Sequence, residues 1–187
     1  MEEKLKRLYK ECVLELNNIG IDLSEENVGK IDISFSKRKT KRYGCCKQED
    51  PDKTTSYRKN RKLYYKKFNK HHIEISKWLI ELNDDIIKNT IMHEIIHCLP
   101  DCNNHGKQFK LYANLINKKL GYNISRLGNK EEDFKKSNLE FKIEFPNYKY
   151  KIACSECGVL YYRQRLSKNF SKKYRCGKCR GKLIILN

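Results

Sequence analysis

Residues 83–97 read NDDIIKNTIMHEIIH, and this stretch carries the pattern that decides the fold. Its apolar residues recur at helical spacing from Ile86 onward, as in a helix that packs into a core. Asn83 and the two aspartates that follow it offer capping oxygens and negative charge for the start of that helix. Pro100 predicts an end near Leu99, because proline disfavours the helical conformation in the residue before it.

Two histidines and a glutamate on this helix predict a metal site. His93 and His97 are four residues apart and share a face, so both imidazoles can reach one zinc ion. Glu94 lies one position along, where its carboxylate can hold a zinc-bound water and accept its proton before attack on a peptide carbonyl. Chance would give this pattern in about one such chain in a hundred. Neither a second oxyanion donor nor a proton donor to the leaving amine is identified.

A catalytic zinc ion needs a third protein ligand, and His105 is our prediction. It follows His97 by eight residues, beyond the helix break at Pro100, so the intervening loop can fold it back toward the metal. Cys98, Asp101 and Cys102 are competing ligands. A thiolate binds zinc well, but it would make the site more closed and electron-rich than hydrolysis usually employs.

The C-terminal region contains a second predicted zinc site. Two C-x-x-C pairs are separated by eighteen residues, the spacing of a four-thiolate zinc ribbon, and they consist of Cys154, Cys157, Cys176 and Cys179. We expect this site to be closed and structural, flanked by strands over 159–165 and 182–186. A redox function is disfavoured because no βαβ pattern surrounds either pair. Cys12, Cys45 and Cys46 are interpreted as buried or incidental thiols.

Composition favours a nucleic-acid partner. The chain has 187 residues and a formal net charge of +18, which attracts phosphate backbones. The stretch between the two cysteine pairs combines basic and aromatic side chains that could contact DNA, although its aromatics could equally form the core of a small ribbon. A codon bias toward Lys would also explain the charge. This stretch includes Tyr161, Tyr162, Arg163, Arg165, Lys168, Phe170, Lys172, Lys173, Tyr174 and Arg175.

The N-terminal residues mix charges with apolar side chains, unlike a signal peptide, and no stretch has the roughly 20 apolar residues of a membrane span. We expect a soluble, cytoplasmic protein without a membrane partner, in which the nine cysteines stay reduced or bind metal. Association with DNA or the nucleoid is compatible with this location. The oligomeric state is not predicted.

Periodicity predicts the other elements. We expect helices over about 5–19 and 107–120, strands over 31–36, 71–76 and 141–145, and a long exposed loop over 47–62. The nearly all-polar segment 128–140 is interpreted as a linker. The predicted organisation is therefore a metallopeptidase domain over 1–127, this linker, and a zinc-ribbon domain over 141–187.

These motifs together resemble the SprT-like family, which includes the Spartan proteases that act on proteins crosslinked to DNA. The resemblance rests on the 93–97 motif, on His105-Gly106-Lys107-Gln108-Phe109 at the start of the next helix, and on the four-cysteine ribbon. Tyr43-Gly44-Cys45 also resembles the family's region before the active-site helix. The resemblance implies an α+β zincin-like domain with helices packed on a small antiparallel sheet, three histidine ligands and a glutamate base.

The resemblance also implies a protein substrate and a basic surface that directs the enzyme to DNA-bound proteins. Two other hypotheses stay open. The chain could be a nucleic-acid-binding zinc protein that keeps the fold without useful turnover, although an intact Glu94 favours the enzyme. It could also be another zinc hydrolase, since the motif specifies a water-activating site more firmly than an amide substrate.

Overall fold

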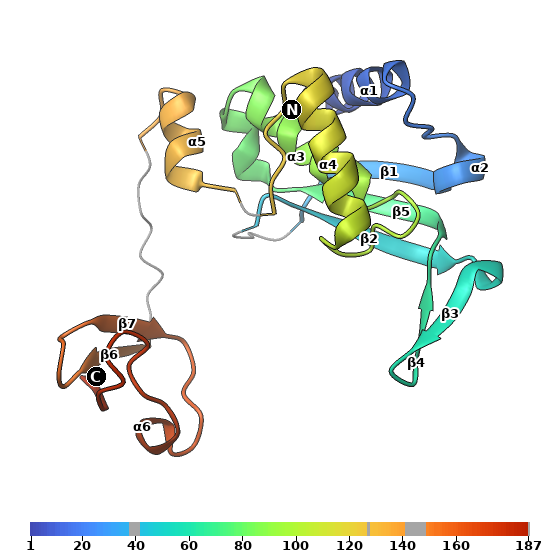
Figure 1. Ribbon diagram of the computed structural model, residues 1–187. Coiled ribbons are helices and arrows are strands. Elements are labelled where there is room, and N and C mark those ends of the chain that lie inside the picture. Colours follow the sequence, from blue (N-terminus) through green and yellow to red (C-terminus); the bar gives the residue numbers. More distant parts are fainter. Residues whose placement is uncertain (38–41, 127, 141–148, 187) are drawn as a thin grey trace. The chain divides into compact units, whose positions relative to one another are not determined.

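The computed structural model describes residues 1–37, 42–126, 128–140 and 149–186 (Figure 1). The chain divides into two compact units, Met1–Phe141 and Lys142–Asn187. Each unit has a hydrophobic core of its own. The strand expected over 141–145 lies outside the described residues.

A three-stranded sheet in the order β1-β5-β2 forms the centre of the first unit, and a two-stranded hairpin, β3-β4, extends from it (Figure 1). The strands are β1 (Lys30–Phe35), β2 (Gly44–Pro51), β3 (Ser56–Lys59), β4 (Lys62–Tyr65) and β5 (Phe68–Ile75). β2 pairs with β5 antiparallel, whereas β1 pairs with β5 in parallel. The sheet is therefore mixed and not wholly antiparallel, because the chain forms β2, β3 and β4 between β1 and β5 and so gains the long connection that parallel partners need.

The helices of this unit are α1 (Glu2–Asn18), α2 (Glu25–Val28), α3 (Asp84–Ile96), α4 (Lys107–Leu120) and α5 (Lys130–Lys136), with short 3-10 helices η1 (Lys53–Thr55) and η2 (Lys77–Glu81). α1 and α3 pack against the sheet, and α4 packs against α3 (Figure 1). α4 ends at Gly121, whose φ of 75° is the left-handed conformation that stops a helix. No helix among the described residues is both long and apolar enough to cross a bilayer.

Helix α3 lies at the centre of the core and carries the predicted metal site. Its side chains are buried on nearly every face, which is the pattern of a helix enclosed by other elements. The Asn83 side chain accepts a hydrogen bond from the Ile86 amide and caps the start, as predicted. The end comes earlier than predicted, at Ile96, because Cys98 and Leu99 donate to carbonyls only three residues back and tighten the last turn.

Two segments without a regular apolar pattern are nevertheless ordered. The prediction of an exposed loop over 47–62 is wrong, since that segment includes β3 and most of β2. Asn60 and Arg61 have φ of 50° and 61°, the geometry of a tight hairpin turn. Both strands of the hairpin are largely exposed, so they show no alternation of buried and exposed residues.

The segment expected as a linker contains α5, which packs against the rest of the first unit. The Phe134 ring stacks on Trp78 at a centroid distance of 5.9 Å. The Tyr43 hydroxyl donates to an Asp133 oxygen at 2.6 Å. One apolar residue in a charged helix is too little for periodicity to detect, so its packing becomes visible only in the folded protein.

The second unit is small. Its sheet has the antiparallel order β7-β6-β8, built from β6 (Tyr150–Cys154), β7 (Leu160–Arg163) and β8 (Leu183–Ile185), and it includes the short helix α6 (Phe170–Lys173). Among its described residues, the core consists of four buried side chains, Ile152, Cys154, Cys176 and Leu183. With the first unit, this confirms the α+β class and a four-cysteine cluster consistent with a zinc ribbon.

Candidate active site and metal centres

Three histidine side chains converge beside the end of α3. The Nε2 atom of His105 lies 2.9 Å from that of His93 and 3.3 Å from that of His97. α3 supplies His93, His97 is the C-cap residue directly after it, and the turn before α4 supplies His105. Phe109 of α4 lies under all three rings at centroid distances of 4.7–4.9 Å. The three Nε2 atoms therefore point at one another in a set that can hold a metal ion.

The opposite nitrogens of two rings are held by backbone carbonyls. His93 Nδ1 lies 3.0 Å from the Ser125 oxygen, and His97 Nδ1 lies 2.7 Å from the Cys102 oxygen. A carbonyl only accepts, so each Nδ1 carries the proton and each Nε2 keeps its lone pair. This arrangement orients metal-binding histidines in many proteins.

Burial keeps these imidazoles neutral. Burial, together with the neighbouring His97 and His105, lowers the pKa of His93 to about 4. Burial also lowers the pKa values of His97 and His105. Neutral imidazole is the form that binds a metal.

The competing ligands are directed elsewhere. The Cys98 sulfur lies 3.6 Å from the Cys46 sulfur, on a contact inside the core. Cys102 is also buried and contributes its carbonyl to His97. Asp101 is exposed and has a left-handed backbone, with φ of 59°. Among the described residues, the metal-competent group near α3 contains the three histidines and none of these.

Glu94 is buried beside the histidines, with 6% of its surface exposed. Burial raises the pKa of its carboxyl to about 7, while a hydrogen bond from the Cys46 backbone and the charge of Arg42 act in the opposite direction. A carboxyl with a pKa near neutrality is matched to accepting and returning a proton. The Cys46 amide that holds it belongs to β2, so the sheet positions the base.

Gly44 makes room for that carboxylate. A Cβ at this position would lie 2.8 Å from Glu94 Oε1 and 2.9 Å from its Cγ, closer than side chains can pack. β2 thus approaches α3 closely at a position where any larger residue would displace the carboxylate.

The histidines and Glu94 line a cleft of about 1150 Å³. One wall is the start of β2 and the other includes α5. Arg42 and Arg126 supply positive charge to its lining. The three histidines and the buried carboxyl therefore border one open cleft.

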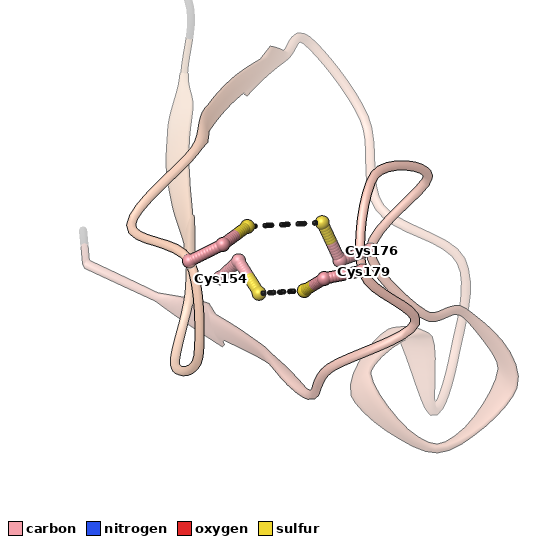
Figure 2. Close-up of side chains that lie close together, drawn as sticks. Cys154, Cys176 and Cys179 are labelled. Atoms are coloured by element: carbon pink, nitrogen blue, oxygen red, sulfur yellow. Dashed lines mark hydrogen bonds between the residues drawn. The ribbon is translucent and has the colours of Figure 1, made fainter.

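The four cysteines of the second unit also converge (Figure 2). The Cys154 and Cys179 sulfurs are 3.4 Å apart, and those of Cys157 and Cys176 are 3.6 Å apart. The Tyr161 hydroxyl lies 3.1 Å from the Cys176 sulfur. That contact and nearby backbone amides lower the pKa of Cys176 to about 6, which favours the thiolate. The group can hold a second metal ion.

A family model described as the SprT-like family matches residues 6–128. The chain belongs to the SprT-like family. The match includes the three histidines and Glu94, whereas the four cysteines lie beyond it. The resemblance inferred from the motifs is therefore confirmed.

Curated relatives agree with this assignment. A "Protein SprT-like" of Lactococcus lactis is 34% identical over 121 residues, which cover 61% of this chain and 66% of the relative. A "Protein SprT-like" of Streptococcus pneumoniae is 30% identical over 116 residues, covering 57% of this chain and 63% of the relative. A third, from Oceanobacillus iheyensis, is 56% identical over 36 residues, or 19% of this chain and 23% of the relative. The chain spans just under two thirds of the length of the first two.

Several features of this SprT-like site could not be assigned from the sequence. The carbonyls of Ser125 and Cys102 orient the histidines, but every residue has a carbonyl and no pattern marks these two. The hydrogen bond from the Cys46 amide to Glu94 could not be predicted either, because every residue except proline has a backbone amide. The sequence marked Gly44 only as part of Tyr43-Gly44-Cys45, the segment that resembles the family. It did not predict the close approach of Gly44 to Glu94.

The aromatic side chains of the ribbon divide between core and surface. Tyr161 and Phe170 pack against its buried residues. Tyr162 and Tyr174 are 40% and 50% exposed. Tyr161 and Phe170 therefore belong to the ribbon core, whereas Tyr162 and Tyr174 lie at the surface, and contact of these exposed rings with DNA stays a prediction.

Proposed function

We propose that this SprT-like protein is a zinc-dependent metallopeptidase. The observation that carries the proposal is the convergence of three histidine Nε2 atoms beside the buried Glu94. Ligand nitrogens about 2.0–2.1 Å from a tetrahedral zinc ion are roughly 3.3 Å from one another. The observed 2.9 Å and 3.3 Å are close to that spacing. The donor set therefore fits zinc and leaves one position open.

His93, His97 and His105 would hold the catalytic ion, which supplies a Lewis acid that activates water and polarises a carbonyl. Glu94 accepts the proton of the attacking water. Its raised pKa lets the same carboxyl return the proton toward the leaving amine. Arg42 and Arg126 contribute positive charge to the cleft in which negative charge develops on the carbonyl oxygen.

A second zinc ion would be held by the four cysteines. Sulfurs about 2.3 Å from a tetrahedral zinc ion are roughly 3.8 Å apart, near the observed 3.4 Å and 3.6 Å. With four protein ligands this site has no open position for substrate. We assign it a structural role, giving two zinc ions per chain.

The proposed substrates are proteins bound or crosslinked to DNA. The net charge of +18 and the exposed basic residues of the ribbon support contact with nucleic acid. We place the protein inside the cell, in association with DNA and not with a membrane. A nucleic-acid-binding protein with little or no turnover is the alternative, and it would show binding without cleavage.

Cleavage of a DNA-bound protein tests this function. We expect the zinc-loaded protein to degrade a protein substrate, with a clear increase when both substrate and enzyme are bound to DNA. Gel electrophoresis and mass spectrometry of the products would measure it, with enzyme stripped by a chelator and then reloaded with zinc as the control. Cleavage that is indifferent to DNA would refute the substrate assignment and leave the peptidase intact. No cleavage by a protein that binds two zinc ions would favour the alternative.

Gly44→Ala should reduce turnover and leave zinc binding unchanged. The added methyl group displaces the Glu94 carboxylate, and misplacing a catalytic group by about 1 Å can cost roughly a hundredfold in rate. Steady-state kinetics and metal analysis would measure the two effects. Gly177→Ala is the matched control, because a Cβ there meets nothing closer than 3.8 Å. Equal loss in both variants, or loss of zinc in Gly44→Ala, would contradict the positioning role.

A further inference from the structure

The hairpin β3-β4 has a concentration of positive charge that the proposed active site does not use. From Lys53 to Lys67 the sequence has seven basic residues and no acidic one. The hairpin projects from the end of the sheet (Figure 1). Within the described residues, no salt bridge joins a carboxylate to the six basic residues Lys53, Arg58, Lys59, Arg61, Lys62 and Lys66.

One face of the hairpin combines aromatic rings with lysines. Tyr57 lies opposite Tyr64, and Lys59 lies opposite Lys62. Since side chains alternate between faces, these four share one face, and all are exposed. The two tyrosine rings stack at a centroid distance of 5.6 Å and an angle of 24°. Stacked rings beside two cations match a nucleotide strand, which presents a flat base and a phosphate at each step.

Two local features oppose the stability of the isolated hairpin. Lys59 and Lys62 place like charges directly across from each other, which destabilises paired strands. Arg61 occupies the left-handed turn position, with φ of 61°, where glycine is preferred. A polyanion would relieve the repulsion between the two lysines and would bind the positive charge of Arg61 at the strained turn position.

The hairpin is also attached to the loop that carries the third histidine. The Asp101 amide donates to the Lys66 carbonyl at 2.9 Å, and the Asn103 side chain donates to the Tyr65 carbonyl at 2.8 Å. Asn103 in turn lines the cleft. A strand bound to the hairpin would therefore lie near the edge of the active site.

We propose that the β3-β4 hairpin binds single-stranded nucleic acid, through Tyr57 and Tyr64 for bases and through Lys59, Arg61 and Lys62 for phosphates. This proposal assigns a nucleic-acid-binding surface to the proposed peptidase, and it rests on the proposed function for nucleic acid as the class of partner. A bilayer surface fits less well, since the turn is Asn60-Arg61 and the exposed Leu63 lies on the face opposite the tyrosine pair.

Fluorescence anisotropy with labelled 20-nucleotide oligo-dT, and oligo-U as the RNA arm, tests the charge contribution. Lys59→Gln/Arg61→Gly/Lys62→Gln removes three phosphate contacts, so the slope of log affinity against log salt should become shallower by about 2, and affinity near 0.1 M salt should fall by roughly a hundredfold. Lys6→Gln/Lys10→Gln/Lys119→Gln removes the same charge at exposed helical positions and should leave affinity nearly unchanged. Equal losses in the two triple variants would overturn the proposal.

Two further variants separate stacking and folding from charge. Tyr57→Leu/Tyr64→Leu should abolish the preference for oligo-dT over an abasic strand of equal length. The slope of log affinity against log salt should stay as in the wild type. Arg61→Gly alone improves the turn, so it should weaken binding while the melting temperature stays equal or rises. A tyrosine variant that keeps the full preference for bases, or hairpin variants that lose binding to anionic vesicles but not to oligonucleotides, would refute the assignment. Binding is measured without cleavage, so a failure of the peptidase proposal would remain distinguishable.

Discussion

Glu94→Gln is expected to abolish proteolysis, by at least about a thousandfold, while both metal sites remain loaded. The amide keeps the shape of the side chain but cannot accept the proton from water. Metal analysis and product detection on the same sample would measure the two properties. Undiminished cleavage by this variant would show that Glu94 is not the base. His97→Asn is the contrasting control, because it should lose activity together with one metal ion.

The same variant should make the metal-free protein more stable at alkaline pH. Burial raises the folded-state pKa of Glu94 from 4.5 to about 7, so between these values the folded protein binds more protons than the unfolded chain. Its contribution to stability is present below pH 4.5 and is lost as pH rises through 7, a change of roughly 3 kcal/mol. Gln does not titrate, so thermal melts of metal-free Glu94→Gln should show a weaker dependence on pH. Parallel pH profiles for the two proteins would contradict the burial argument.

Cys176→Ala is expected to unfold the second unit and leave the first unit folded. Among its described residues, the core of the second unit has four buried residues, two of which are cysteines of the metal group, so a bound metal would supply most of its folding energy. Structural zinc contributes about 10–16 kcal/mol to small domains of this kind. The described part of the first unit has 24 buried core residues of its own. Hydrogen exchange followed by mass spectrometry should show full exchange over 149–186 and unchanged protection of α3.

Chelation of the wild-type protein should give the same exchange pattern in the second unit. Cys45→Ala, which changes a cysteine outside the four-cysteine group, is the control and should keep both ions. Persistent protection of 149–186 in metal-free protein would mean that the ribbon folds through its small core alone.

The sequence predicted best those residues that a single helix or turn brings together, because their separation along the chain determines their separation in space. A helix converts the four-residue step from His93 to His97 into a shared face, and the two C-x-x-C pairs each form a turn, so both metal groups could be predicted. The parallel pairing of β1 with β5 could not, because it depends on where strands far apart in sequence meet.

The hairpin and α5 escaped prediction for a different reason. Hydrophobic periodicity reports on elements that bury a face, and β3-β4 exposes both of its faces. α5 docks through Phe134 and through the polar contact of Asp133 with Tyr43, so it has no apolar stripe. The cleft wall it forms was consequently predicted as a linker.

The attachment of the hairpin to the third-ligand loop has an entropic consequence. Ordering one backbone residue costs about 1–2 kcal/mol at 25 °C, and in a free loop that cost would arise only when His105 bound a metal ion. Here the Asp101 amide and the Asn103 side chain already hold the loop against β4 and its end. Folding therefore orders the loop in advance, and His105 reaches the metal site with little freedom left to lose.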